Sequence, residues 1–253
     1  MIFDSHSHTK FSADSKMLAK DAIARAESLN FGLVFTEHLD FDLPGGFTFN
    51  PAEYFGEYKK FRGDRVRLGA EVGMTKISRE KNKKFVAEND FDLIIGSIHM
   101  LDGEDIYHKE FFAGKTKSET YKKFFAVTAE EAAVEDFDVL GHIDYICRAA
   151  TYEDTSIDYP TFKNEIDEVL KIVVEREKVL ELNTRRLSNP EVLKELEPVY
   201  RSYKNFGGRF VTIGSDAHRT EAVGGNFKVA LEFVSALGLQ PVTFGKRKIE
   251  LLS

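Results

Sequence analysis

Residues 2–8 read Ile-Phe-Asp-Ser-His-Ser-His, a short apolar run that passes directly into acidic and histidine residues. Residues 210–218 repeat the pattern as Phe-Val-Thr-Ile-Gly-Ser-Asp-Ala-His. Apolar runs of this kind are typical of buried strands, because a strand covered on both faces is apolar nearly throughout. Both stretches therefore predict a buried strand that ends in polar residues able to do chemistry.

Similar apolar runs recur along the chain and alternate with segments of helical period. The expected strands are 2–3, 33–35, 66–70, 93–98, 139–140, 179–182 and 210–213. Apolar residues spaced by three and four predict amphipathic helices over 18–29 and 162–173. Further helices are expected near 51–62, 78–88, 116–136, 190–205 and 221–237.

Seven strand–helix repeats with short connections predict parallel strands joined by right-handed crossovers. We expect an α/β fold in the form of a TIM-like barrel of about seven βα units, with a doubly wound open sheet as the alternative. The 253 residues fit a single unit of that kind, and no linker rich in Pro, Gly or Ser divides them. The longest irregular stretch, residues 41–50, follows the second strand and is a candidate lid.

The composition argues against several classes of protein. A net charge of −7 does not suit a protein that grips nucleic acid. The longest apolar runs are far shorter than the ~20 residues that cross a bilayer, so no membrane partner is expected. No signal peptide is visible, and the single cysteine, Cys147, cannot form an internal disulfide, so we expect a cytoplasmic protein.

The histidines are placed unevenly. Six of the seven lie at or just beyond the expected carboxyl end of a strand, where barrel enzymes build their active sites. These are His6, His8, His38, His99, His142 and His218, and the acids Glu71 and Asp216 follow strands in the same way. Histidines with only structural roles would be scattered over helices and loops, so this gathering predicts a metal site.

The type and number of these side chains indicate which metals could bind. Imidazole and carboxylate ligands without thiolate suit Zn²⁺, Mn²⁺ or Fe. Residues two apart in an extended segment point the same way, so His6 and His8 can reach one ion. The ligands are too many for one ion, which predicts two or three clustered ions with Glu71 as the bridging carboxylate. Cys147 is more simply read as a buried core residue.

The series His6-Ser7-His8, Glu37-His38, Glu71, His99, Gly141-His142 and Ser215-Asp216-Ala217-His218 resembles the polymerase-and-histidinol-phosphatase (PHP) superfamily over nearly the whole chain. It is most similar to the stand-alone histidinol-phosphate phosphatases of that superfamily. The resemblance implies one distorted (β/α)7 TIM-like barrel domain over residues 1–253.

The resemblance also implies three groups of metal ligands: His6, His8, Glu71 and Asp216 for the first ion; Glu71, His99 and His142 for the second; and Asp14, His38 and His218 for the third. Two positions depart from the family pattern. Asp14 stands where many members have histidine, and Glu37 stands where they have aspartate. The first departure leaves the metal preference of the third group open.

The activity that the resemblance implies is hydrolysis of a small phosphate monoester, most simply L-histidinol phosphate in histidine biosynthesis. A hydroxide that bridges two ions is the expected nucleophile, and Asp216 or His218 passes a proton to the leaving alkoxide. Arg148 and Arg186 follow the fifth and sixth strands and are expected to clamp the phosphate, with Arg185 as the competitor of Arg186.

Two other functions remain open from the sequence. One is a PHP-type nuclease or a phosphatase for another phosphoester, although the net charge of −7 does not support a nucleic-acid track. The other is a non-catalytic metal-binding module, although every ligand position holds a competent residue. For the ammonium and imidazole groups of histidinol, the acidic candidates at the expected mouth are Glu37, Asp40, Asp42 and Glu110. His108 could also contact this cation, but a solvated loop position is the simpler reading for His108 and Glu110.

Overall fold

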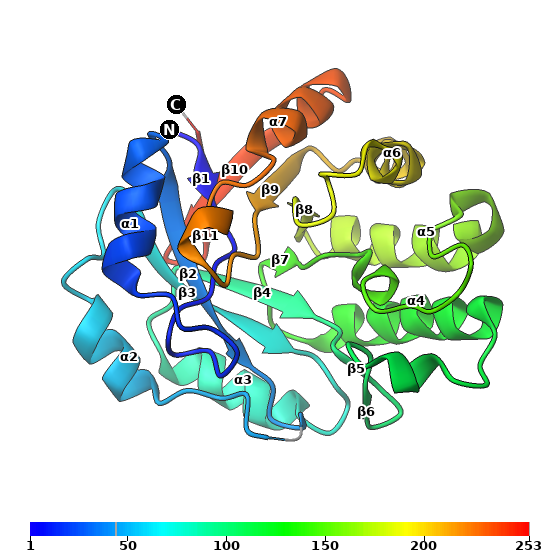
Figure 1. The fold of residues 1–253 in the computed structure, drawn as a ribbon, viewed down its shortest axis with the longest axis horizontal. Coiled ribbons are helices and arrows are strands. Elements are labelled where there is room, and N and C mark those ends of the chain that lie inside the picture. The colour runs from blue at the N-terminus through cyan, green and yellow to red at the C-terminus, as the bar shows by residue number, and fades with distance from the viewer. Residues whose placement is uncertain (44, 253) are drawn as a thin grey trace.

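The structure is a computed structural model that describes residues 1–43 and 45–252, and strands and helices alternate along it (Figure 1). The strands of the main sheet are β1 (Phe3–Asp4), β2 (Gly32–Leu39), β3 (Val66–Gly73), β4 (Leu93–Ser97), β7 (Val139–Leu140), β8 (Val179–Asn183), β9 (Phe210–Gly214), β10 (Gln240–Gly245) and β11 (Lys248–Leu251). The first seven of these occupy the positions that the apolar runs predict.

The helices lie around the outside of these strands in Figure 1. They are α1 (Ala19–Ser28), α2 (Pro51–Tyr58), α3 (Arg79–Glu88), α4 (Lys117–Val134), α5 (Tyr159–Glu175), α6 (Pro190–Asn205) and α7 (Phe227–Ala236). Smaller elements are the antiparallel pair β5 (Met100–Leu101) and β6 (Glu104–Asp105) and the 3₁₀ helices η1 (Lys109–Phe112), η2 (Tyr145–Cys147) and η3 (Thr220–Ala222). Across residues 1–43 and 45–252, no helix is long and apolar enough to cross a membrane.

Helix starts follow local sequence signals. The Asn50 side chain accepts hydrogen bonds from two backbone amides of the first turn of α2, and Pro51 occupies the first helical position. At the start of α6, the Asn189 side chain accepts from the Glu191 amide, and Pro190 occupies the first helical position. Asparagine caps the unpaired amides, and proline has no amide that would need capping, so both residues favour a helix start at these points.

The seven parallel strands from β1 to β9 close into a barrel. Each pairs with the next in the order β1-β2-β3-β4-β7-β8-β9. The two end strands then meet, because the Ser5 amide donates to the Ile213 carbonyl at 2.9 Å and the His8 amide donates to the Ala217 carbonyl at 2.8 Å. A parallel bridge between Ser7 and Ala217 continues this contact. The TIM-like barrel is confirmed, and the open sheet is excluded.

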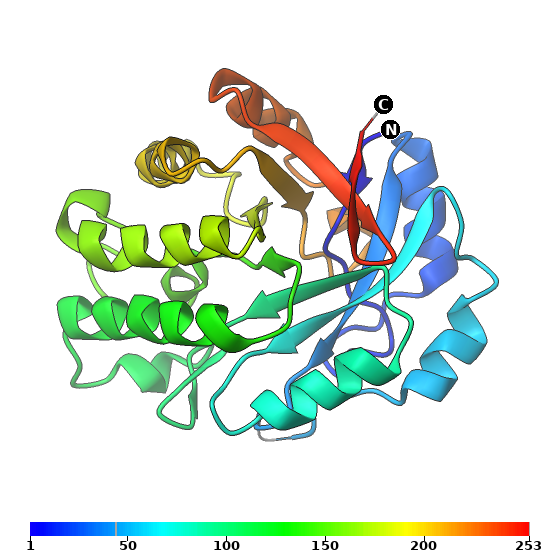
Figure 2. The ribbon, with the colours of Figure 1, turned by 180° about the vertical axis from the view of Figure 1, so that it is seen from behind.

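The strands β10 and β11 form a hairpin that the apolar pattern does not predict. The hairpin is seen in red when the fold is viewed from behind (Figure 2). Val242 and Phe244 of β10 pack against a buried cluster inside the barrel, whose other members are Phe3, Val34, Leu93, Ile95, Val139 and Val179. Arg247 in the hairpin turn binds Asp136 and Asp138, which precede β7. The hairpin therefore covers the amino end of the barrel, opposite the strand ends that carry the histidines.

Candidate metal centre

A cavity of about 1080 Å³ opens at the carboxyl ends of the barrel strands. Most of the predicted ligands line it, namely Asp14, His38, Glu71, His99, His142, Asp216 and His218. His6 and His8 follow β1 and are completely buried beside these residues. Leu43 and Phe47 also line the cavity, so the expected lid over 41–50 borders the site, while residue 44 lies outside the described residues.

The first predicted group is assembled in the barrel interior. The Nε2 atoms of His6 and His8 face each other at 3.0 Å. Glu71 Oε2 lies 3.2 Å from His6 Nε2 and 3.4 Å from His8 Nε2. Asp216 Oδ1 lies 3.3 Å from His8 Nε2 and 3.8 Å from His6 Nε2. Four buried donor atoms on three different strand ends thus converge on one point, as ligands of a single cation would.

The other carboxylate oxygen of Glu71 belongs to the second predicted group. Glu71 Oε1 lies 2.7 Å from His142 Nε2 and 3.2 Å from His99 Nε2. The Ser97 hydroxyl donates to the same oxygen at 2.7 Å. Oε2 thus faces His6 and His8 while Oε1 faces His99 and His142, so Glu71 lies between the first two predicted groups.

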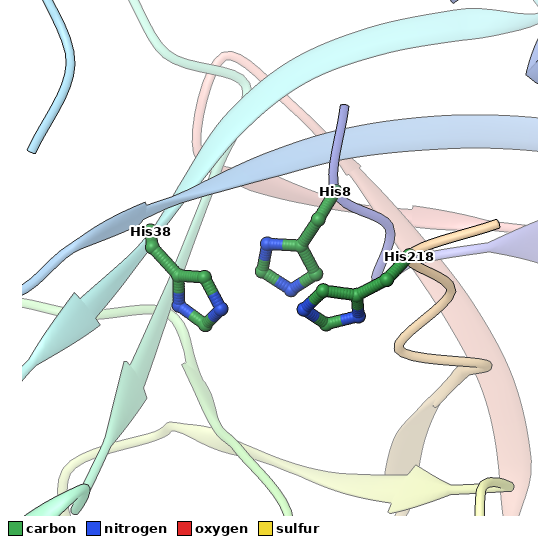
Figure 3. Close-up of side chains that lie close together, drawn as sticks. All are labelled: His8, His38 and His218. Atoms are coloured by element: carbon green, nitrogen blue, oxygen red, sulfur yellow. The ribbon is translucent and has the colours of Figure 1, made fainter. Parts of the chain in front are cut away.

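The third predicted group lies nearer the cavity mouth. The ring of His8 stacks on those of His38 and His218, with centroids 4.1 Å and 4.3 Å away, and Figure 3 shows the three rings facing one another. Asp14 Oδ2 lies 3.0 Å from His218 Nε2 and 3.5 Å from His38 Nε2. The structure therefore brings Asp14, His38 and His218 together.

The charge states of the acids suit metal binding. Burial would raise the pKa of Glu71, but the neighbouring His6, His99 and His38 outweigh it and hold the pKa well below its usual range. Burial also opposes ionisation of Asp216, and Arg148 together with His6 lowers its pKa well below the usual value. Both carboxylates are thus ionised at neutral pH, which is the form that binds a metal.

The histidines divide into two sets. Burial lowers the pKa of His8 and of His142, so these rings are neutral at pH 7. Burial acts in the same direction on His6, His38 and His99, but adjacent carboxylates outweigh it and raise their pKa values. A cation bound here would meet ionised carboxylates and two neutral imidazoles, and it would displace protons from His6, His38 and His99.

Four of the rings have their Nδ1 atoms held by an oxygen: His6 by Glu181 at 2.7 Å, His8 by Ser12 at 3.1 Å, His99 by Asp40 at 2.8 Å and His218 by the Asp216 carbonyl at 3.0 Å. A partner on Nδ1 fixes the ring orientation and leaves Nε2 for a metal. All of the donors in the three groups are imidazoles or carboxylates. The residues therefore fit divalent transition metals of the kind that the sequence predicts.

Asp216 occupies an unusual backbone conformation. Its φ is +53°, in the left-handed region that few non-glycine residues adopt. The Asp216 amide donates to the His6 carbonyl at 2.9 Å, so the β1 and β9 ends hold this conformation between them. Strain of this kind persists where the surrounding structure fixes it, and here it directs the carboxylate toward the histidines.

Arg148 lies beside the centre as the sequence predicts. Its Nη1 donates to Asp216 Oδ2 at 2.6 Å, and its guanidinium lies over the Tyr145 ring at 4.8 Å from the centroid. Within the described residues, its Nε and Nη2 atoms find no hydrogen-bond partner although both are buried. Arg148 therefore has N–H groups at the wall of the cavity from which an oxyanion could accept hydrogen bonds.

Of the two adjacent arginines after β8, Arg185 rather than Arg186 lines the cavity. Arg185 lines the cavity, with its Nη1 3.7 Å from Asp216 Oδ2. The guanidinium of Arg186 binds Asp144 at 2.6 Å and Glu195 at 3.2 Å. Among the described residues, Arg186 does not line the cavity. The structure thus does not bring Arg186 to the site, because two acids from neighbouring segments bind its guanidinium.

The expected acidic rim also needs correction. Glu37 is completely buried and accepts hydrogen bonds from Thr9 and Ser12, so it cannot meet a substrate. Asp40 lines the cavity, but one of its oxygens is used by the Nδ1 atom of His99. Asp42 accepts from the Thr75 hydroxyl.

A different acid stands at the mouth. Asp105, at the end of β6, lines the cavity together with Tyr107 and His108. Glu110, on η1, is absent from the described lining residues. The side chain of His108 is 67% exposed and lies 3.4 Å from Asp105. The sequence pattern does not distinguish Asp105 from Glu110, because both follow His99 in an irregular segment.

Sequence reasoning missed Glu181 and Tyr145. Glu181 interrupts the apolar strand Val179–Asn183, and a charged residue inside a buried strand is a signal that could have identified it. Tyr145 packs against the rings of His99 and His142, with centroids 4.9 Å and 4.7 Å away. Cys147 is buried as expected, and burial raises the pKa of its thiol.

Comparisons with known proteins identify relatives of this chain. The family model of the PHP domain matches residues 4–185. A probable histidinol-phosphatase of Clostridium acetobutylicum is 46% identical over 98% of each chain. A histidinol-phosphatase of Lactococcus lactis is 30% identical over 85% of this chain and 83% of the relative.

Solved structures resemble the chain as well. A histidinol phosphate phosphatase from Lactococcus lactis, solved in complex with zinc, L-histidinol and phosphate, has a TM-score of 0.92 and 28% identity, and the match covers 98% of each chain. A putative histidinol phosphatase from Listeria monocytogenes has a TM-score of 0.70 at 17% identity, covers 90% of this chain and 99% of that one, and supports the fold alone. The chain belongs to the PHP domain family.

Proposed function

We propose that this protein is a metal-dependent phosphoric monoester hydrolase that converts L-histidinol phosphate into L-histidinol and inorganic phosphate. The observation that carries the proposal is Glu71, whose two oxygens face two separate histidine groups beneath a cavity with a buried arginine in its wall. The names of the two curated relatives and the ligands of the Lactococcus structure support the same activity.

We assign two or three divalent ions, Zn, Mn or Fe, to the three groups: His6, His8, Glu71 and Asp216; Glu71, His99 and His142; and Asp14, His38 and His218. Zinc in the Lactococcus structure supports this choice of metals. When bound, such ions lower the pKa of coordinated water and neutralise the charge on phosphoryl oxygens. Uncatalysed hydrolysis of phosphate monoesters is among the slowest reactions known, so this charge stabilisation is the main requirement.

Arg148 and Arg185 bind the phosphoryl oxygens. Arg148 is the stronger candidate, because its Nε and Nη2 atoms are buried without a hydrogen bond to a described residue. Asp216 and Tyr145 already hold its guanidinium in place, so little entropy is lost when phosphate binds. Arg185, whose side chain is 41% exposed, adds a second positive charge from the cavity mouth.

Proton transfer falls to Asp216, with His218 as the alternative. Asp216 lies beside Arg148 and lines the cavity, where its carboxylate is placed to pass a proton from the attacking water to the departing alkoxide. His218 lines the same cavity beside Asp14 and could donate to the alkoxide instead.

The alcohol portion of the substrate meets the mouth of the cavity. Histidinol carries an ammonium group and an imidazole, and Asp105 with Tyr107 provides an acid and an aromatic ring at this place. An acid pairs with the ammonium, and an aromatic face attracts a cation. These two residues replace the acidic rim that the sequence predicts.

The test is phosphate release from L-histidinol phosphate by protein loaded with zinc or manganese. We expect turnover that a chelator abolishes and that His142→Ala lowers strongly, while Lys84→Ala on the exposed face of α3 has no effect. If no phosphate is released with zinc, manganese or iron, the proposed activity is wrong. Cleavage of single-stranded DNA or RNA in the same assays would favour the nuclease instead.

A further inference from the structure

Glu181 lies in the middle of β8 and points into the barrel beneath the metal centre. Its side chain is completely buried. Oε1 lies 2.7 Å from His6 Nδ1, and Oε2 accepts from the His142 backbone amide at 2.7 Å. Asn183 donates to Oε2 as well, at 3.3 Å. One carboxylate thus touches residues of two different metal-binding groups, on strand ends that are far apart in the sequence.

The chemistry of these contacts requires a carboxylate. Both oxygens act as acceptors, because the His142 backbone amide and the Asn183 side-chain nitrogen can only donate, and the Nδ1 atom of His6 donates in the tautomer that leaves Nε2 free. With its proton on Nδ1, His6 presents the Nε2 lone pair toward Glu71 Oε2, 3.2 Å away. The contact between Asp40 and His99 Nδ1, at 2.8 Å, has the same form in the second group.

The neighbouring strand leaves room for this carboxylate. A Cβ atom at Gly214, the last residue of β9, would lie 2.3 Å from Glu181 Oε1 and 2.4 Å from the Cβ of His6. Any larger residue would therefore displace Glu181 or His6. Gly214 does not have a positive φ, so the close approach of these two side chains is a physical reason for glycine at this position.

We propose that Glu181 is a positioning residue that fixes the His6 ring and the His142 backbone together and thereby strengthens metal binding in the first two groups. This role of Glu181 rests on the proposed metal binding, and it does not depend on which phosphate ester is the substrate. Glu181 is placed to orient ligands rather than to bind the metal, because it contacts His6 on the Nδ1 side of the ring, away from Glu71, His8 and Asp216.

Glu181→Gln is the informative variant, because glutamine has the same shape but presents one acceptor and one donor group. An amide NH₂ facing His6 would force the ring proton onto Nε2, and an NH₂ facing the His142 amide would place two donors together. We expect the zinc dissociation constant to rise about 10- to 100-fold, the range for lost outer partners of metal ligands. Competition with a chromophoric chelator measures it, and circular dichroism of the metal-free protein checks the fold.

Two further variants complete the experiment. Glu131→Gln removes another buried carboxylate, which binds Arg79 on the outside of the barrel, and should leave zinc affinity unchanged. Glu181→Asp keeps the charge and should recover part of the lost affinity, and it replaces the glutamine variant if that protein does not fold. Unchanged zinc affinity in Glu181→Gln overturns the proposal. So does the loss of a whole equivalent of zinc at saturation, since Glu181 would then be a ligand. Failure of the native protein to hydrolyse histidinol phosphate would overturn the proposed function and leave this comparison intact.

Discussion

Arg148 and Arg186 show what a sequence reveals about single residues and what it leaves out. The metal-ligand residues could be predicted because their position just after apolar runs places them at one end of a barrel. Whether Arg185 or Arg186 enters the cavity could not be predicted in this way. Asp144 and Glu195 bind Arg186, and they come from the segment after β7 and from α6. Their approach depends on how these segments pack, which local sequence does not specify.

Removing the Arg148 guanidinium should impair catalysis more than metal binding. Arg148→Ala is expected to lower kcat/KM for the phosphate ester by about 100- to 1,000-fold, because a preorganised donor to a developing oxyanion is lost. Zinc content should stay near that of the native protein, since Arg148 contacts Asp216 Oδ2 while Oδ1 faces the histidines. Steady-state kinetics and elemental analysis measure the two effects. Unchanged kcat/KM would remove Arg148 from the site.

Elements that pack on the barrel were harder to predict than its strands. The parallel strands are recognisable as continuous apolar runs, and the helices have a regular period with proline at three of their starts. The β10–β11 hairpin has neither signal, because β11 is exposed throughout and β10 is buried only where it covers the barrel end. β10 is buried only because it packs on the closed barrel, and no local sequence pattern indicates that contact.

The hairpin should contribute to stability without contributing to the chemistry. Phe244 is buried against the inner cluster at the amino end of the barrel. Phe244→Ala is expected to lower the free energy of unfolding by about 3–5 kcal/mol, the usual cost of truncating a buried phenylalanine. Ile249→Ala on the exposed strand is the control and should change it by less than about 0.5 kcal/mol. Denaturant unfolding measures both, and equal effects would show that the hairpin does not close the barrel.

The contact between α3 and α4 should make stability depend on pH. Burial raises the pKa of Glu135 to about 7, although Asn82 donates to its carboxylate at 3.1 Å. The pKa of Glu135 in the folded protein lies above its ordinary value of 4.5. The free energy of unfolding of the protein therefore falls as the pH rises from about 4.5 through 7. Glu135→Gln should therefore be more stable than the native protein by on the order of 2 kcal/mol at pH 8. Urea unfolding should show this difference shrinking toward pH 5, and a difference independent of pH would refute the assignment.

At the scale of the whole molecule, the sequence predicts the barrel and the end at which its chemistry lies. It does so because parallel βα units place all carboxyl ends of the strands on one side. The supporting contacts of the ligands were not predictable in the same way. Glu181 contacts the Nδ1 atom of His6, and Asp40 contacts the Nδ1 atom of His99. These residues lie on or just after different strands, so they are brought into contact only when the barrel closes.

The three ligand groups predict the metal content of the purified protein. Elemental analysis of protein that has never met a chelator should find two or three transition-metal ions per chain. The expectation follows from nine imidazole and carboxylate side chains in one centre, more than a single ion of four to six ligands can use. One ion or none would contradict the assignment of separate groups.

The most direct test of the proposed function is a comparison of kcat/KM for L-histidinol phosphate, p-nitrophenyl phosphate and glycerol phosphate with the same metal. All three esters offer the same oxygens to the metal ions and arginines, so a preference must come from contacts with the alcohol portion at Asp105 and Tyr107. We predict that L-histidinol phosphate exceeds the other two by at least about a hundredfold, a cautious fraction of the discrimination that paired polar groups achieve. Equal values would contradict the assignment to histidinol phosphate while leaving a general phosphatase.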